Sequence, residues 1–212
     1  MRSFGLDCVG HETYVKSRIA EEVKDRAGPT EPQSDAQLEI GHVLCMDIVG
    51  FSKLLVDEQR DVSNRLNRIV RETEQFRAAE MANKLIRLPT GDGMALVFYT
   101  GPEAPARCAI EISRGLKDSS FGLRMGIHSG PVNKVSDVND RSNLTGTGIN
   151  LAQRVMDCGD AGHILLSKRA SEDLEQHSKW RPRLHRHLLC CSRSSLNTAS
   201  GDHACIVSAN LK

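Results

Sequence analysis

Two aspartates in the sequence are placed where they could hold a divalent cation. Asp47 interrupts the end of the apolar run 43–49, which is typical of a buried strand, and Asp92 lies in the tip of a Gly-Asp-Gly turn. Carboxylates that converge at a sheet edge repel one another unless a cation lies between them, and Mg²⁺ prefers one or two carboxylates together with substrate phosphates. The alternative is that Asp47 caps a helix and Asp92 is an ordinary turn aspartate, and spacing alone leaves both interpretations open.

The backbone directly after Asp47 could bind phosphate. Ile48, Gly50, Phe51 and Ser52 belong to a segment that turns just before a helix. The N–H groups of such a turn can point toward an anion. This segment is therefore a candidate binding site for a polyphosphate.

A second candidate pair lies near residue 150. Asn150 and Arg154 are four residues apart, so a helix displays them together, on the side opposite an apolar arc formed by Ile149, Ala152, Val155 and Met156. An arginine suits developing phosphoryl charge, and an asparagine can orient a ribose or a phosphate oxygen. The alternative is an ordinary surface pair.

An alternation of strands and helices must position these residues. The patterns predict strands at 43–49, 85–89, 94–99, 123–128 and 163–166, a loop at 133–143, and helices at 105–115, 149–157 and 168–177. A further long helix is marked by Val62, Leu66, Ile69, Thr73 and Phe76 and is expected to run to about Asn83. This order, with a hairpin at its centre, favours an α+β sandwich built on a ferredoxin-like unit.

The two ends of the chain carry weaker patterns. Residues 1–40 are polar and predict a leader or linker with, at most, a short helix, whereas 181–212 predict an irregular tail. The tail holds ligand types suited to zinc, but their spacing matches no common finger pattern; the candidates are His185, His187, Cys190, Cys191, His203 and Cys205. The seven cysteines are odd in number and scattered, which indicates reduced thiols.

Composition excludes several functional classes. The chain has 28 basic and 27 acidic residues and a net charge of +1, so it lacks the basic excess of a typical nucleic-acid-binding protein. No apolar stretch is long enough for a membrane span, and the N-terminus lacks the apolar core of a signal peptide. We therefore expect a cytoplasmic protein with no nucleic-acid partner and no membrane span.

Together, four motifs resemble the catalytic domain of the class III nucleotide cyclases. They are DIVGFS at 47–52, TGDG at 90–93, RMGIHSG at 124–130 and GINLAQR at 148–154. They occur in the order and at the spacing of that family, and the resemblance covers roughly residues 41–178. The catalytic domain is therefore expected to span residues 41–180.

The resemblance implies an enzyme that converts a nucleoside triphosphate to a 3′,5′-cyclic nucleotide and pyrophosphate at a homodimer interface. Asp47, Asp92 and the Ile48 carbonyl match the ligands of two Mg²⁺ or Mn²⁺ ions per active site. Asn150 matches the residue that orients the ribose, and Arg154 the residue that stabilises charge on the α-phosphoryl group. In this family the second subunit supplies that pair.

The resemblance also assigns substrate-binding positions. Arg124 matches an arginine near the phosphates. ATP-specific relatives carry Lys, and Asp or Thr, where this chain has Leu88 and Asn143, and a leucine side chain cannot hydrogen-bond a base. A terminal hairpin whose lysine grips the phosphates is not recognisable after Trp180.

The expected substrate is ATP, because adenylate cyclases dominate the family. The alternatives are a UTP or CTP cyclase of the same family, and a catalytically weak nucleotide-binding module that regulates a partner by dimerisation. A palm-type nucleotidyl transferase is more remote, because the charge balance gives no sign of a template groove.

Overall fold

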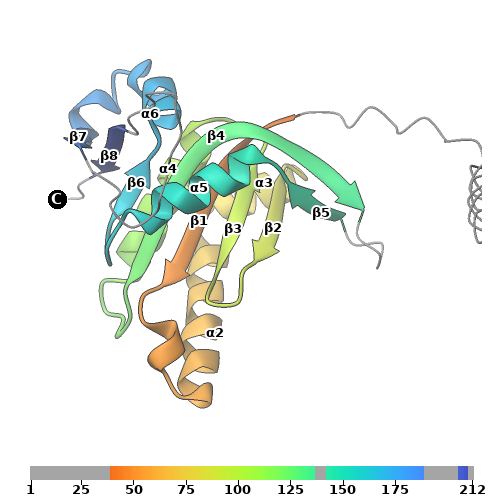
Figure 1. Ribbon diagram of the computed structural model, residues 1–212, viewed down its shortest axis with the longest axis vertical. Helices are drawn as coiled ribbons and strands as arrows, with labels where there is room; N and C mark the ends of the chain where they lie inside the picture. Colours follow the sequence, from red (N-terminus) through yellow and green to blue (C-terminus); the bar gives the residue numbers. More distant parts are fainter. Residues whose placement is uncertain (1–38, 137–141, 189–204, 210–212) are drawn as a thin grey trace, which may run out of the picture. The chain divides into compact units, whose positions relative to one another are not determined.

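A computed structural model describes residues 39–136, 142–188 and 205–209 (Figure 1). Its strands are β1 (Glu39–Ile48), β2 (Leu85–Pro89), β3 (Gly93–Phe98), β4 (Leu123–Ser136), β5 (Ser142–Thr145), β6 (Ile164–Leu166), β7 (Leu184–Leu188) and β8 (Cys205–Ala209). Its helices are α2 (Val56–Glu72), α3 (Glu74–Met81), α4 (Glu103–Gly115), α5 (Thr147–Asp157) and α6 (Lys168–Glu175), with short 3₁₀ helices η1 (Phe51–Lys53) and η2 (Arg181–Arg183).

The strand order confirms the α+β fold with a ferredoxin-like unit. The sheet runs β2-β3-β1-β4-β6-β8-β7, and β5 pairs with β4 outside this path. The first four strands in this order are antiparallel to their neighbours, whereas β6 lies parallel to β4. With β1 between β3 and β4, both the central hairpin and β4 lie directly beside the strand that carries Asp47.

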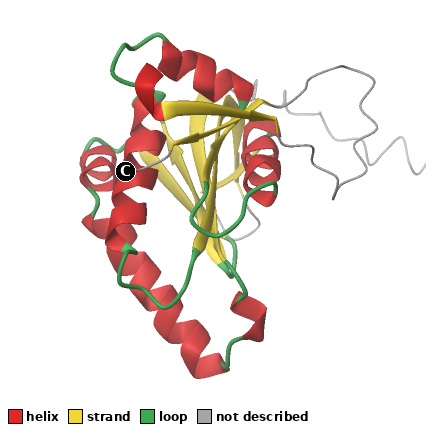
Figure 2. Ribbon diagram, turned by 90° about the vertical axis from the view of Figure 1, so that its left-hand side faces the viewer, coloured by secondary structure: helices red, strands yellow, loops and turns green. Residues whose placement is uncertain are grey.

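Helices cover both faces of the sheet, and each face has its own core (Figure 2). Leu44 and Met46 of β1 pack with residues of α2, α3 and α4, whereas Val43 and Cys45 pack with residues of α5 on the other side. Successive side chains of a strand alternate between faces, so a strand buried on both sides reads as a continuous apolar run. This arrangement explains the run that precedes Asp47.

The long helix expected to reach Asn83 is two helices. Thr73 has extended backbone angles (φ −66°, ψ 142°) and begins α3 as its N-cap, because its hydroxyl oxygen accepts a hydrogen bond from the Phe76 N–H. The same hydroxyl donates to the Val70 carbonyl at 2.8 Å, which satisfies the end of α2. The apolar spacing continues across Thr73 because both helices bury the same face, so periodicity alone could not show the break.

The polar segment 133–143, expected as a loop, contributes to two strands. β4 continues to Ser136, and Asn133–Ser136 pair antiparallel with Ser142–Thr145 of β5. Backbone hydrogen bonds hold such a ribbon whatever its side chains are, and its polar residues carry no apolar alternation that would predict it.

The segment 181–212, expected as an irregular tail, contains two strands. β7 pairs antiparallel with β8, and β8 joins the sheet beside β6. No local pattern predicted this hairpin, because a long polar stretch of sequence separates its two strands. Cys190, Cys191 and His203, three of the candidate zinc ligands, lie outside the described residues.

Three further expectations concern metals, thiols and membranes. Among the described residues, no group of three or more His, Cys, Asp or Glu side chains is placed to hold a metal ion. Cys45 and Cys108 are free, but Cys158 is disulfide-bonded, so the expectation of reduced thiols is wrong at that position. A cysteine count could not show this, because it does not reveal which thiols the fold brings within bonding distance. No helix in the described part of the chain is long and apolar enough to cross a membrane.

Candidate active site

Asp47 lies between two neighbouring strands at the end of β1. Its register partners are Gly93 on β3 and Arg124 on β4, and its side chain is buried. A Cβ atom at position 93 would lie 1.9 Å from the Met46 carbonyl oxygen, so only glycine allows β3 to pass this close to β1. The residue type at 93 therefore fixes the hairpin beside Asp47.

Asp92 occupies the turn directly before Gly93. Its carbonyl accepts a hydrogen bond of 3.0 Å from the Ile48 N–H, which joins the hairpin tip to the end of β1, and its side chain is exposed. The structure thus brings both aspartates to one edge of the sheet. The helix-cap interpretation of Asp47 is wrong, because Asp47 belongs to β1 and the N-cap of η1 is Gly50.

Arg124 forms a two-point ion pair with Asp47. Its Nε donates to one carboxylate oxygen at 2.9 Å, and its Nη2 donates to the other. The hydrogen bonds to Asp47 raise the pKa of Arg124, and the nearby charges of Asp157 and Asp92 act in the same direction. The Arg124 guanidinium therefore lies in a region of negative potential that these three aspartates create.

The backbone after Asp47 offers open donors. The N–H groups of Ile48 and Val49 are engaged by the carbonyls of Asp92 and Gly122. Within the part of the chain that the structure describes, the N–H groups of Gly50, Phe51 and Ser52 have no acceptor. Gly50 has a φ of 77°, a left-handed conformation that suits glycine and turns the chain into η1.

Asn150 and Arg154 both lie exposed on α5. The helix packs closely on β4, since a Cβ at Gly126 would lie 2.4 Å from the Met156 backbone nitrogen. Considering only described residues, Arg154 has no ion-pair partner, and no hydrogen bond or ion pair joins Asn150 or Arg154 to the two aspartates. Within one chain, the two candidate pairs remain unconnected.

The two base-reading candidates occupy different strands. Leu88 is half-buried on β2 opposite Ala95 and packs against the core beneath α5. Asn143 pairs with Val135 in the ribbon of β5 and β4.

The donors at the sheet edge fit a hard divalent cation. Asp47, Asp92 and the Ile48 carbonyl provide oxygen atoms only, which Mg²⁺ and Mn²⁺ prefer. Two carboxylates leave coordination positions for phosphate oxygens, and the open N–H groups at 50–52 lie in the segment that follows. These donors could hold a divalent cation together with a phosphate group.

A cavity that was not predicted from the sequence adjoins Asp92 on the α2 side of the hairpin. Ser63, Asn67 and Arg71 line it from α2 at intervals of four residues, beside the apolar positions Leu66 and Val70. In the sequence, the only sign of this cavity was the row of polar residues beside an apolar stripe on the same helix.

No protein-family model matches the sequence, and no curated protein matches it either. Solved structures do match. The adenylyl cyclase CyaB from P. aeruginosa has a TM-score of 0.58 at 19% identity, over 83% of this chain and 96% of that one. The guanylate cyclase domain of RhGC from Catenaria anguillulae, in complex with GTP, has a TM-score of 0.57 at 20% identity, over 80% and 94%.

A third similar structure is the catalytic core of a rhodopsin-guanylyl cyclase with converted specificity, in complex with ATPαS. Its TM-score is 0.59 at 19% identity, over 81% of this chain and 94% of that one. All three similarities extend over most of both chains, and the matching proteins are adenylyl or guanylyl cyclases. This chain therefore has the fold of the class III nucleotide cyclase catalytic domain, the family that its four motifs resemble.

Proposed function

We propose that this protein is a nucleotide cyclase that converts a nucleoside triphosphate to a 3′,5′-cyclic nucleotide and pyrophosphate. The observation that carries the proposal is the convergence of Asp47 and Asp92 at one sheet edge, beside a turn with open backbone donors. The fold and the family-like order of the four motifs support it.

In this reaction the ribose 3′-oxygen attacks the α-phosphorus, the bond to the β-phosphate oxygen breaks, and the 3′-hydroxyl proton is released. Divalent ions held by Asp47, Asp92 and the Ile48 carbonyl would lower the pKa of that hydroxyl and neutralise the triphosphate. The N–H groups at 50–52 would hold phosphate oxygens. Arg124, beside Asp47, would contribute a second positive charge toward the phosphates.

We further propose that the active enzyme is a homodimer. Asn150 and Arg154 are exposed, and Leu151 between them is a 40% exposed apolar side chain. A second copy that places its α5 over the sheet edge would bring this pair to the aspartates. Arg154 would then stabilise charge on the α-phosphoryl group, and Asn150 would orient the ribose.

ATP is our proposed substrate, and the base-reading positions make UTP or CTP the alternative. Leu88 offers a base only apolar contact, so neither the usual adenine set nor the usual guanine set of side chains is present. The structural neighbours include complexes with GTP and with ATPαS, so this fold accommodates either purine.

The test is mass-spectrometric product analysis after incubation with ATP, GTP, CTP and UTP together, with Mg²⁺ and then Mn²⁺. The control variant is Asp92→Ala, whose side chain is exposed, so its loss leaves the fold intact. A cyclic nucleotide that disappears in the variant supports the proposal and identifies the base.

The same experiment tests the second candidate, a regulatory nucleotide-binding module. The apolar side chain at Leu88 favours this candidate, because it removes a usual substrate contact. If all four triphosphates stay intact while the protein is folded and dimeric, the cyclase proposal is wrong and the module is favoured.

A further inference from the structure

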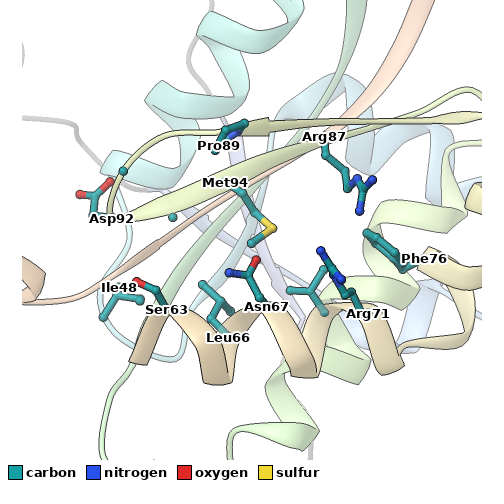
Figure 3. Close-up of a pocket in the computed structure, with 13 residues that line it drawn as sticks. Ile48, Ser63, Leu66, Asn67, Arg71, Phe76, Arg87, Pro89, Asp92 and Met94 are labelled. Carbon is teal, nitrogen blue, oxygen red and sulfur yellow. The ribbon is translucent and has the colours of Figure 1, made fainter. Parts of the chain in front are cut away.

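A cavity of about 440 Å³ lies between α2 and the hairpin of β2 and β3 (Figure 3). Its volume is in the range of small-molecule sites. Apolar residues of β1, α2, α3 and the hairpin form its walls: Ile48, Leu66, Val70, Phe76, Pro89 and Met94. Gly91, Asp92 and Gly93 form the end nearest the sheet edge.

Two arginines give the cavity a positive side. Figure 3 shows the guanidinium groups of Arg71 and Arg87 reaching into the same space beside the ring of Phe76. Arg87 lies 5.6 Å from the centre of that ring and 3.4 Å from the Glu80 carboxylate, in a half-exposed pair. Such an exposed pair is weak and leaves the other N–H groups of Arg87 available.

Arg71 is the less engaged of the two arginines. Within the described part of the chain it has no ion pair and no hydrogen bond from its side chain. It ends a polar row on α2 with Ser63 and Asn67, one turn apart, and all three line the cavity. The planar guanidinium fork matches a carboxylate or a phosphate in two-point geometry.

We propose that this cavity binds a small organic anion, a carboxylate or phosphate ester with an apolar body, as a ligand separate from the nucleotide. The apolar walls take the body of the ligand, Arg71 and Arg87 bind its anionic group, and Asn67 and Ser63 hydrogen-bond to it.

The cavity lies on the opposite side of the hairpin from the base-reading candidate. Arg87 and Leu88 are successive residues of β2, so their side chains leave opposite faces. Leu88 packs in the core beneath α5, whereas Arg87 lines the cavity beside α2. The ligand would therefore contact the segment that carries Asp92 without occupying the nucleotide position.

The test is isothermal titration calorimetry with three probes: 1-naphthoate, phenyl phosphate and the neutral 1-naphthalenemethanol. We expect one or both anions to bind at least tenfold more tightly than the neutral probe. Arg71→Gln should weaken anion binding at least tenfold. The matched control is Arg68→Gln, an exposed arginine on the same helix that does not line the cavity, and it should bind as the unmodified protein does.

The nucleotide analogue α,β-methylene-ATP, which cannot release pyrophosphate, separates this proposal from the cyclase proposal. The analogue should leave the binding of the anions unchanged. The Arg71→Gln variant should bind the analogue as tightly as the unmodified protein does. Three results would overturn the proposal: no binding of either anion at millimolar concentration, equal binding by Arg71→Gln and Arg68→Gln, or displacement of the anions by the analogue. Each can occur whether or not the protein is a cyclase.

Discussion

Arg124 on β4 holds both carboxylate oxygens of Asp47 on the neighbouring strand β1. The pair is mostly buried, with side-chain exposures of 29% for Arg124 and 10% for Asp47. A buried carboxylate needs a compensating charge, and here a guanidinium supplies it from within the chain. A metal ion bound by Asp47 would supply the same charge from solution.

Arg124→Ala should therefore lower stability and make it dependent on metal. Because the pair keeps some solvent contact, we expect a loss of about 1–2 kcal/mol in the free energy of unfolding. Mn²⁺ should raise the Tm of the variant more than that of the unmodified protein, since the ion replaces the missing charge. Thermal unfolding with and without MnCl₂ measures both effects, and equal Mn²⁺ shifts would argue against Asp47 as a metal ligand.

Gly93→Ala should disrupt the hairpin beside Asp47. The added Cβ would overlap the Met46 carbonyl at 1.9 Å, and backbone cannot move aside as a flexible side chain can. We expect a loss of about 2–4 kcal/mol in urea unfolding. Gly101→Ala is the control, because nothing lies within 4 Å of its added Cβ. Similar losses in both variants would show that β3 does not pass β1 this closely.

The sequence was sufficient to predict much of this edge. The apolar run before Asp47 indicated a buried strand, and the Gly-Asp-Gly turn indicated the hairpin that brings Asp92 to it. Both predictions rest on local patterns, which indicate the same strand and turn whatever the rest of the chain does. The ion pair of Arg124 with Asp47 could not be predicted, because it depends on a register between strands 77 residues apart.

The elements that the sequence did not reveal lack such local patterns. Thr73 begins a new helix within an unbroken apolar stripe. β5 depends on pairing with β4, and β8 depends on pairing with the distant strand β6, so their own residues contain little information about them. The cavity beside Asp92 combines residues of α2 with residues of the hairpin, and only the tertiary structure brings these together.

Stability should fall in mild acid because of His128. Its Nδ1 lies 2.8 Å from the Ser167 hydroxyl, and burial lowers its pKa from 6.5, with Arg169 acting in the same direction and Asp173 in the opposite one. The unfolded chain therefore binds this proton more readily, so stability is present above pH 6.5 and is lost as the pH falls below it.

The check is to measure the Tm of the unmodified protein and of His128→Gln from above pH 6.5 to below it. Glutamine can still hydrogen-bond Ser167 but does not titrate, so the variant should lose less stability on acidification. His42, whose pKa burial also lowers, keeps part of the dependence in both proteins. An identical pH dependence in the two proteins would exclude His128 as a contributor.

Leu88→Lys combined with Asn143→Asp should shift base selectivity toward ATP. These changes install the pair typical of ATP-specific relatives, and a lysine at the half-buried Leu88 can extend its amine to the surface. We expect the ratio of kcat/KM for ATP over GTP to rise by about tenfold or more, as an added hydrogen bond to the base predicts. An unchanged ratio would mean that these positions do not contact the base.

Mixing two inactive variants tests whether two subunits share each active site. Asp92→Ala and Arg154→Ala each remove an exposed side chain, so both should fold. Random pairing makes half of the dimers mixed, each with one intact site of two, so equal mixing should restore about a quarter of the unmodified activity. If mixed dimers form, as shown by differently tagged subunits, and activity stays at the level of the separate variants, the shared-site account is wrong.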